Sequence, residues 1–116
     1  MVATENYVPK RGDIVWIDFE PQSGKEQKGR RPAVVISNSR YNKVVGLAIL
    51  CPITSKIKGF PFEVILTPSF SISGAVLADQ IKSFDWRTRN TEFIEKIDNE
   101  TMEKILELIG KIIEIE

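Results

Sequence analysis

The chain has 116 residues, of which 42% are hydrophobic and 28% are charged. These proportions predict one globular domain over residues 1–116 and argue against a disordered, collagen-like or membrane-spanning chain. The 16 basic residues balance the 16 acidic ones, but residues 1–91 hold 13 basic and 8 acidic side chains, and residues 92–116 hold 3 and 8. A neutral total disfavours a general polyanion binder, whereas this asymmetry permits a local basic face.

Histidine is absent and Cys51 is the single cysteine. Mechanisms that need an imidazole base are therefore excluded, and a zinc site is not expected. No glycine motif for a nucleotide cofactor occurs, so no cofactor is expected. One cysteine and an N-terminus without an apolar signal segment predict a cytoplasmic protein. Any catalysis must use Arg, Lys, Asp, Glu, Ser, Thr or Tyr.

The first half of the chain alternates short apolar runs with polar stretches. Residues 12–19 predict a strand that closes at a Glu-Pro pair, and a polar stretch of 12 residues follows over 20–31. Loops of that length are usually functional or disordered. The β-branched run at 33–37 predicts a buried strand, and residues 38–43 are expected to form a polar turn.

Four more apolar runs predict strands in the second half, over residues 46–54, 60–66, 74–78 and 81–86. Several short strands at regular spacing favour a small barrel or sandwich over a parallel sheet. Phe60 is expected in the core rather than stacked on a ligand. Trp16 and Trp86 are expected in the core or in a dimer contact.

In the last segment, after Asp98, the apolar residues recur every three or four positions instead of every two. This period predicts an amphipathic helix. Asp98 is a suitable N-cap, and Glu100 lies in the first turn, where a negative charge is favoured. The predicted fold class is therefore mainly β with a C-terminal helix. The apolar positions of the helix are Met102, Ile105, Leu106, Ile109, Ile112 and Ile113.

Several segments in this order resemble one family: RGDIVWIDF, then P-x-x-G-x-E-Q-x-G-x-RP-AVVIS, CPIT, GxPFEV and LADQIKSFDWR. Together they are similar to the MazF/PemK/Kid toxin ribonucleases of bacterial toxin–antitoxin pairs. The resemblance implies an SH3-like barrel with a C-terminal helix and a homodimer. It also implies sequence-selective cleavage of single-stranded RNA without a metal, and inhibition by an acidic MazE/PemI-like antitoxin that occupies the RNA groove.

The resemblance also assigns roles to residues. It places the catalytic arginine at Arg31, directly before the proline, and a catalytic threonine at Thr54. Glu26 is the third candidate catalytic residue, because its carboxylate is the nearby acceptor for the 2′-proton of RNA. The expected substrate-binding residues are Gln27, Lys56, Asp79 and Gln80.

This residue set suits RNA cleavage, because RNA carries its own nucleophile in the 2′-hydroxyl. A guanidinium at Arg31 can donate two parallel hydrogen bonds to the charged phosphorane. The Thr54 hydroxyl can donate to a non-bridging oxygen, and whether Glu26 or another group is the general base stays open. Two alternatives stay open as well: a toxin of the same fold that inhibits DNA gyrase by protein contact, and a non-catalytic RNA-binding barrel domain.

Overall fold

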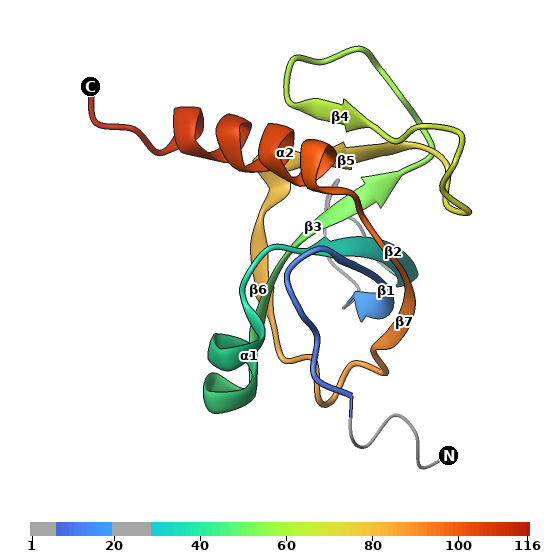
Figure 1. Ribbon diagram of the computed structural model, residues 1–116, viewed down its shortest axis with the longest axis vertical. Coiled ribbons are helices and arrows are strands. Elements are labelled where there is room, and N and C mark those ends of the chain that lie inside the picture. Colours follow the sequence, from blue (N-terminus) through green and yellow to red (C-terminus); the bar gives the residue numbers. More distant parts are fainter. Residues whose placement is uncertain (1–6, 20–28) are drawn as a thin grey trace.

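The structure is a computed structural model that describes residues 7–19 and 29–116 (Figure 1). Its strands are β1 (Asp13–Phe19), β2 (Gly29–Val35), β3 (Ala48–Thr54), β4 (Glu63–Ile65), β5 (Ala75–Leu77), β6 (Lys82–Phe84) and β7 (Glu92–Lys96). Its helices are α1 (Ser39–Val45), the short 3₁₀ helix η2 (Ala78–Gln80) and α2 (Asn99–Ile112). Neither α-helix of the described ranges has the length and apolar character to cross a bilayer.

The strands form one antiparallel sheet in the order β4-β5-β3-β2-β1-β7. Strand β3 pairs with three strands: β2 lies along one edge, and along the other edge its beginning pairs with β6 and its last two residues pair with β5. Within the described ranges β4 and β7 are the end strands, so the sheet curls without closing into a barrel. The expected class, mainly β with a C-terminal helix, is confirmed, and the open edge is where the fold departs from the expected barrel.

Both faces are buried along β3 and along the last three residues of β2, Ala33, Val34 and Val35, which explains why these stretches lack the polar alternation of a half-exposed strand. Successive residues of β1 point to opposite faces, so Ile14 enters one core and Val15 the other. On the first face, the buried side chains of the sheet pack with Met102, Ile105 and Ile109 of α2. On the second face, they pack with Phe84 and Trp86, which confirms the expected core position of Trp86.

Helix α2 lies across the β4 and β5 end of the sheet, and its C-terminal end extends past the body of the molecule (Figure 1). It begins after Asp98, as expected, and the Asp98 carbonyl accepts a hydrogen bond from the Met102 amide at 3.1 Å. The Asp98 side chain makes no capping hydrogen bond. The helix is therefore stabilised mainly by burial of its apolar face.

The prediction of a polar turn at residues 38–43 is wrong, because residues 39–45 form the helix α1. Asn38 caps the helix, its Oδ1 accepting from the Tyr41 amide at 2.9 Å, and Gly46 ends it at φ +82°. Asn42 is completely buried, and its side-chain amide donates to the Pro9 carbonyl at 2.7 Å. Seven mostly polar residues are too few for a periodic signal, so the capping residues are what could have revealed the helix.

Three further details differ from the sequence expectations. No strand was predicted at β7. This segment is a strand because it pairs with β1, which lies far away in the sequence. The strand expected over 60–66 is shorter, covering Glu63–Ile65. Phe60, expected in the core, is 60% exposed, because it lies in the loop before β4.

Candidate functional site

An open cavity of about 350 Å³ lies beside the β1–β2 hairpin. We call it the arginine cavity, because both arginines of the Arg-Arg-Pro sequence reach it. Pairing of Phe19 with Gly29 brings the two ends of the hairpin loop together, two residues from Arg31. The cavity is lined by Trp16, Arg30, Arg31, Pro32, Ile53, Ser55, Ser71, Ile72 and Ser73.

The two arginines have different surroundings. Arg30 lies opposite Asp18 in the β1–β2 register and forms ion pairs with Asp18 at 3.1 Å and with Glu92 of β7 at 2.8 Å. It also donates to the Asn90 carbonyl at 2.7 Å. These contacts hold the Arg30 guanidinium to the sheet, whereas the exposed Arg31 lies opposite Ile17 and contributes to the cavity wall.

Thr54 ends strand β3 next to this cavity. Its neighbours Ile53 and Ser55 line the cavity, while Thr54 itself is only 9% exposed and is not among the lining residues. Its Oγ1 accepts a hydrogen bond from the Lys56 amide at 3.1 Å, an arrangement that keeps the hydroxyl proton available for donation. The candidate residues Thr54 and Arg31 therefore lie on the adjoining strands β3 and β2, at the same end of the sheet.

The chain folds back tightly onto Thr54 at Gly74. Gly74 has φ +127°, and a Cβ atom there would lie 2.1 Å from the Thr54 carbonyl oxygen. Only glycine allows this approach, which positions the loop before β5 against the end of β3. The loop over residues 67–74 thereby becomes one wall of the arginine cavity.

The other predicted site residues are divided between two locations. Asp79 and Gln80 are exposed in η2, outside the lining of the arginine cavity, and Lys56 is exposed just after β3. Asp79 lies close enough to Cys51 of β3 to act on it: burial, with a smaller effect of the Asp79 charge, raises the pKa of the Cys51 thiol to about 12. Glu26 and Gln27 lie outside the described residues.

Sequence reasoning missed several residues of the cavity wall. Trp16, assigned to the core or a dimer contact, is half-buried and lines the cavity. The polar composition of 67–73 indicated a loop, but no local signal showed that Ser71 and Ser73 would line the same cavity as Arg31. Their proximity arises from the pairing of β5 with β3, which is not visible in a local pattern.

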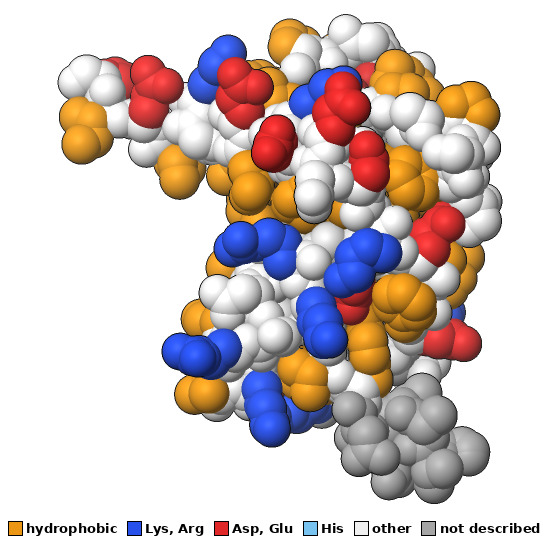
Figure 2. All heavy atoms as spheres, in the orientation of Figure 1, with side chains coloured by type: hydrophobic (Ala, Val, Ile, Leu, Met, Phe, Trp, Pro, Cys, Tyr) orange, Lys and Arg blue, Asp and Glu red, His pale blue; other side chains and the backbone are white. Residues whose placement is uncertain are grey.

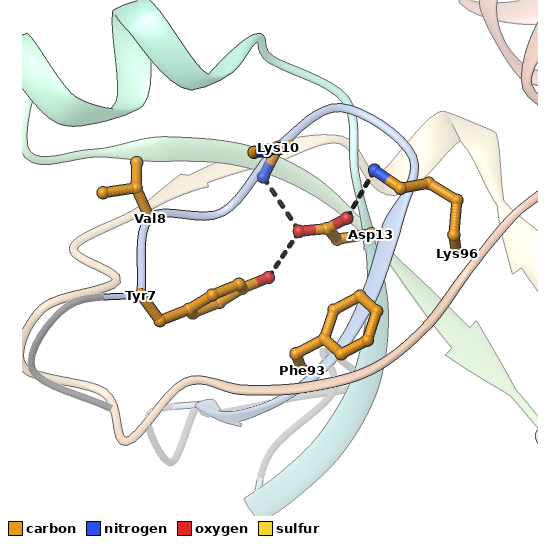
Figure 3. Close-up of a pocket in the computed structure, with 6 residues that line it drawn as sticks. All are labelled: Tyr7, Val8, Lys10, Asp13, Phe93 and Lys96. Atoms are coloured by element: carbon orange, nitrogen blue, oxygen red, sulfur yellow. Dashed lines mark hydrogen bonds and ion pairs between the residues drawn. The ribbon is translucent and has the colours of Figure 1, made fainter. Parts of the chain in front are cut away.

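A second, larger cavity of about 620 Å³ lies where the N-terminal segment meets β7 (Figure 3). The Asp13 carboxylate is nearly completely buried there and accepts hydrogen bonds from the Tyr7 hydroxyl at 2.6 Å and the Lys10 amide at 3.0 Å. Lys96 forms an ion pair with it at 2.7 Å. Burial, then the hydrogen bond and charge of Asp13, raise the pKa of Tyr7. With all its polar groups engaged, this cluster fastens the N-terminal segment to the sheet.

Charge is unevenly distributed over the surface. In Figure 2 many Asp and Glu side chains follow α2, and Lys and Arg side chains gather below it. Exposed basic residues on α1 and around the start of β1 include Lys10, Arg11, Arg40 and Lys43. Among the residues that the structure describes, no group of three or more His, Cys, Asp and Glu side chains is placed to hold a metal ion.

The fold and the arginine cavity together define an antiparallel β protein with a C-terminal helix and an exposed arginine at the end of its first hairpin. Residues 10–113 match the family model of the "PemK-like, MazF-like toxin of type II toxin-antitoxin system". The chain belongs to this toxin family, as its sequence motifs indicated.

Individual relatives agree with this assignment. The chain is 49% identical over 83 residues to the endoribonuclease toxin MazF of Escherichia coli strain K12, covering 72% of this chain and 74% of the relative. It is 34% identical over 107 residues to the endoribonuclease EndoA of Bacillus subtilis, and the match covers 88% of this chain and 91% of the relative. The crystal structure of MazF from Deinococcus radiodurans matches 95% of this chain and 100% of that one at 44% identity, with a TM-score of 0.90. A MazE–MazF complex from that organism matches with a TM-score of 0.84 at 39% identity, and the match covers 96% of this chain and 100% of that one.

Proposed function

We propose that this toxin is an endoribonuclease that cleaves single-stranded RNA at selected sequences, in the cytoplasm and without a metal or other cofactor. The observation that carries the proposal is the exposed Arg31 in the wall of an open cavity, in a chain 49% identical to a named endoribonuclease. The neighbouring Arg30 is held by ion pairs with Asp18 and Glu92, and both arginines of the doublet line the cavity.

The proposed reaction uses the nucleophile that RNA itself supplies. The 2′-oxygen attacks the adjacent phosphorus, a P–O2′ bond forms, and the P–O5′ bond breaks, which leaves a 2′,3′-cyclic phosphate and a 5′-hydroxyl. One proton leaves the 2′-hydroxyl and one is delivered to the departing 5′-oxygen. No covalent intermediate with the protein is needed, and since the chain has no histidine, other side chains must move both protons.

Arg31 would stabilise the phosphorane, because its planar fork donates two hydrogen bonds to charged oxygens and stays protonated. Thr54, on the adjoining strand, would donate its hydroxyl to a non-bridging oxygen. Glu26 is our candidate for receiving the 2′-proton. Lys56 would contact phosphate, and the base edges would be read by Gln27, Asp79 and Gln80.

We further propose two protein partners. The first is a second copy of the chain in a homodimer, since apolar side chains such as Ile65 (60% exposed) and Ile113 (72% exposed) leave surface that a partner would cover. The second is an acidic antitoxin that competes with RNA for its binding site at the arginine cavity. A solved MazE–MazF complex from Deinococcus radiodurans, 39% identical to this chain, supports this second partner.

Incubation of the purified protein with labelled single-stranded RNA, with and without EDTA, tests the proposal. Cleavage that survives EDTA and leaves a cyclic phosphate supports it. Intact RNA together with inhibition of DNA supercoiling would favour the gyrase-directed alternative. Intact RNA that is bound but not cut would favour a non-catalytic RNA-binding domain.

A further inference from the structure

One carboxylate outside the arginine cavity holds a wall of that cavity in place. The wall is the loop over residues 67–74, which we call the serine loop. Its ends are joined by a hydrogen bond from the Leu66 amide to the Gly74 carbonyl at 2.9 Å, and the Phe70 amide donates to the Thr67 carbonyl at 3.2 Å. Phe70 and Ile72 pack against the core that α2 covers. The loop thus has a fixed base, and its outer turn needs a separate anchor.

Glu95 supplies that anchor from strand β7. Its Oε2 accepts hydrogen bonds from the Ser71 amide at 2.8 Å and the Ser71 hydroxyl at 2.7 Å, with a longer one from the Ile72 amide at 3.4 Å. Hydrogen bonds to an ionised carboxylate are roughly twice as strong as those between neutral groups. Glu95 is itself half-buried and paired with Ile14 of β1, so the anchor rests on the rigid sheet.

The residues that Glu95 holds belong to the wall of the arginine cavity. Ser71, Ile72 and the adjacent Ser73 line it together with Trp16 and Arg31 of the β1–β2 hairpin. At about 350 Å³ the cavity falls within the range of small-molecule sites, which suits a single unstacked nucleobase. Its lining includes an indole ring on which a base can stack and serine hydroxyls that can bond to a base edge. The Ser71 hydroxyl already donates its proton to Glu95, so towards a base it can only accept.

We propose that Glu95 is a positioning residue that sets the base preference of the arginine cavity by fixing the serine loop. The inference rests on the proposed function, since it concerns which RNA sequence is cleaved. Glu95 does not line the cavity, so it acts through Ser71 and Ile72. When the loop is held, its hydroxyls present one fixed pattern to the base. When it is released, several bases fit about equally well.

The test compares the wild type with Glu95→Gln and Ser71→Ala on RNAs that differ in one base beside the cleaved bond. The wild type should prefer one base, and each variant should reduce that preference about tenfold. The change should come mainly through a higher KM for the preferred RNA, with kcat altered less than threefold. Ser71→Ala removes only the hydroxyl contact with Glu95 and leaves the two amide contacts, whereas Glu95→Gln removes the charge that all three contacts share. Because both substitutions weaken one anchor, the double variant should lose less preference than the sum of the two single losses.

Glu103→Gln, an exposed change on α2, is the matched control and should leave the preference unaltered. Thermal melting must show that each variant is folded. If wild type cleaves selectively and both variants keep its preference, the inference is wrong while the proposed function stands. A loss of kcat for every RNA, with the preference retained, also overturns the inference. If the wild type cleaves none of the RNAs, the proposed function and the inference fail together.

Discussion

Replacing Gly74 with alanine tests the tight contact between the serine loop and the end of β3. The new Cβ would lie 2.1 Å from the Thr54 carbonyl oxygen and 2.9 Å from its carbonyl carbon, and both are backbone atoms that cannot rotate away. A non-glycine residue at φ +127° adds backbone strain. Strain and forced separation of the strands each cost roughly 1–3 kcal/mol, so we expect a loss of about 4 kcal/mol in the free energy of unfolding. At this chain length that loss lowers Tm by about 15 °C.

Two other glycines provide matched controls, because nothing lies within 4 Å of a Cβ atom built on either. Gly59 has φ +80°, so Gly59→Ala carries strain without a clash and should cost about 1 kcal/mol. Gly110 lies in α2 without a positive φ, so Gly110→Ala should stabilise the protein by roughly 0.5–1 kcal/mol. Urea titration and thermal melting of the three variants rank the effects.

The expected order of stability is Gly110→Ala, wild type, Gly59→Ala and last Gly74→Ala. If Gly74→Ala loses no more stability than Gly59→Ala, the close approach at Thr54 does not exist as described. Any folded Gly74→Ala protein should also cleave RNA more slowly than wild type, since separating the loop from β3 displaces Thr54.

Three further predictions concern single side chains. Arg31→Lys should lower single-turnover RNA cleavage by about 10²–10³, because lysine lacks the paired donors, while Arg40→Lys on α1 should leave cleavage unchanged. Because burial raises the pKa of Cys51 to about 12, an alkylating reagent should react slowly with this thiol in the folded protein at pH 9–11. The free energy of unfolding should also fall between about pH 9 and pH 12, because the thiol ionises at lower pH in the unfolded chain than in the folded protein. Tyr7→Phe should cost about 2 kcal/mol in urea unfolding, because it removes a hydrogen bond to the buried Asp13 carboxylate.

Each of these predictions has a contrary outcome. Cleavage by Arg31→Lys within a few-fold of wild type would reduce Arg31 to a phosphate anchor and transfer the catalytic role to Thr54 and Glu26. Alkylation of Cys51 in the folded protein as fast as in the unfolded chain would show that the thiol is accessible. A Tyr7→Phe variant as stable as wild type would mean that solvent replaces the lost hydrogen bond at Asp13.

Elements with a strong local pattern were predictable from the sequence. Strand β1 and the C-terminal helix lie where they were expected, because their apolar residues recur with the period of the structure that they form. Strand β2 was expected at residues 33–37, but it covers Gly29–Val35, because residues 29–31 belong to the strand although they lack an apolar pattern. Helix α1 was missed because its one completely buried residue, Asn42, is polar. Strand β7 was missed because it exists through pairing with β1 and not through its own composition.

The candidate site was predictable only in part. The motif preceding Pro32 indicated Arg31, and the structure gives a physical distinction from Arg30 in the ion pairs with Asp18 and Glu92. The opposite wall was not predictable, because the serine loop reaches the cavity through strand pairing and through the contact with Glu95. Local patterns in a sequence specify elements, whereas the walls of a cavity depend on how distant elements meet.

The ion pairs of Arg30 also bear on how accurately the hairpin must form. A one-residue shift between β1 and β2 would turn each arginine to the opposite face, bringing Arg31 towards Asp18 and Glu92 and moving Arg30 away from them. The same shift would exchange the side chains of the two separate cores. The carboxylates of Asp18 and Glu92 and the two buried cores therefore both favour the observed alignment, and an error of one residue would displace Arg31 and destabilise the protein at the same time.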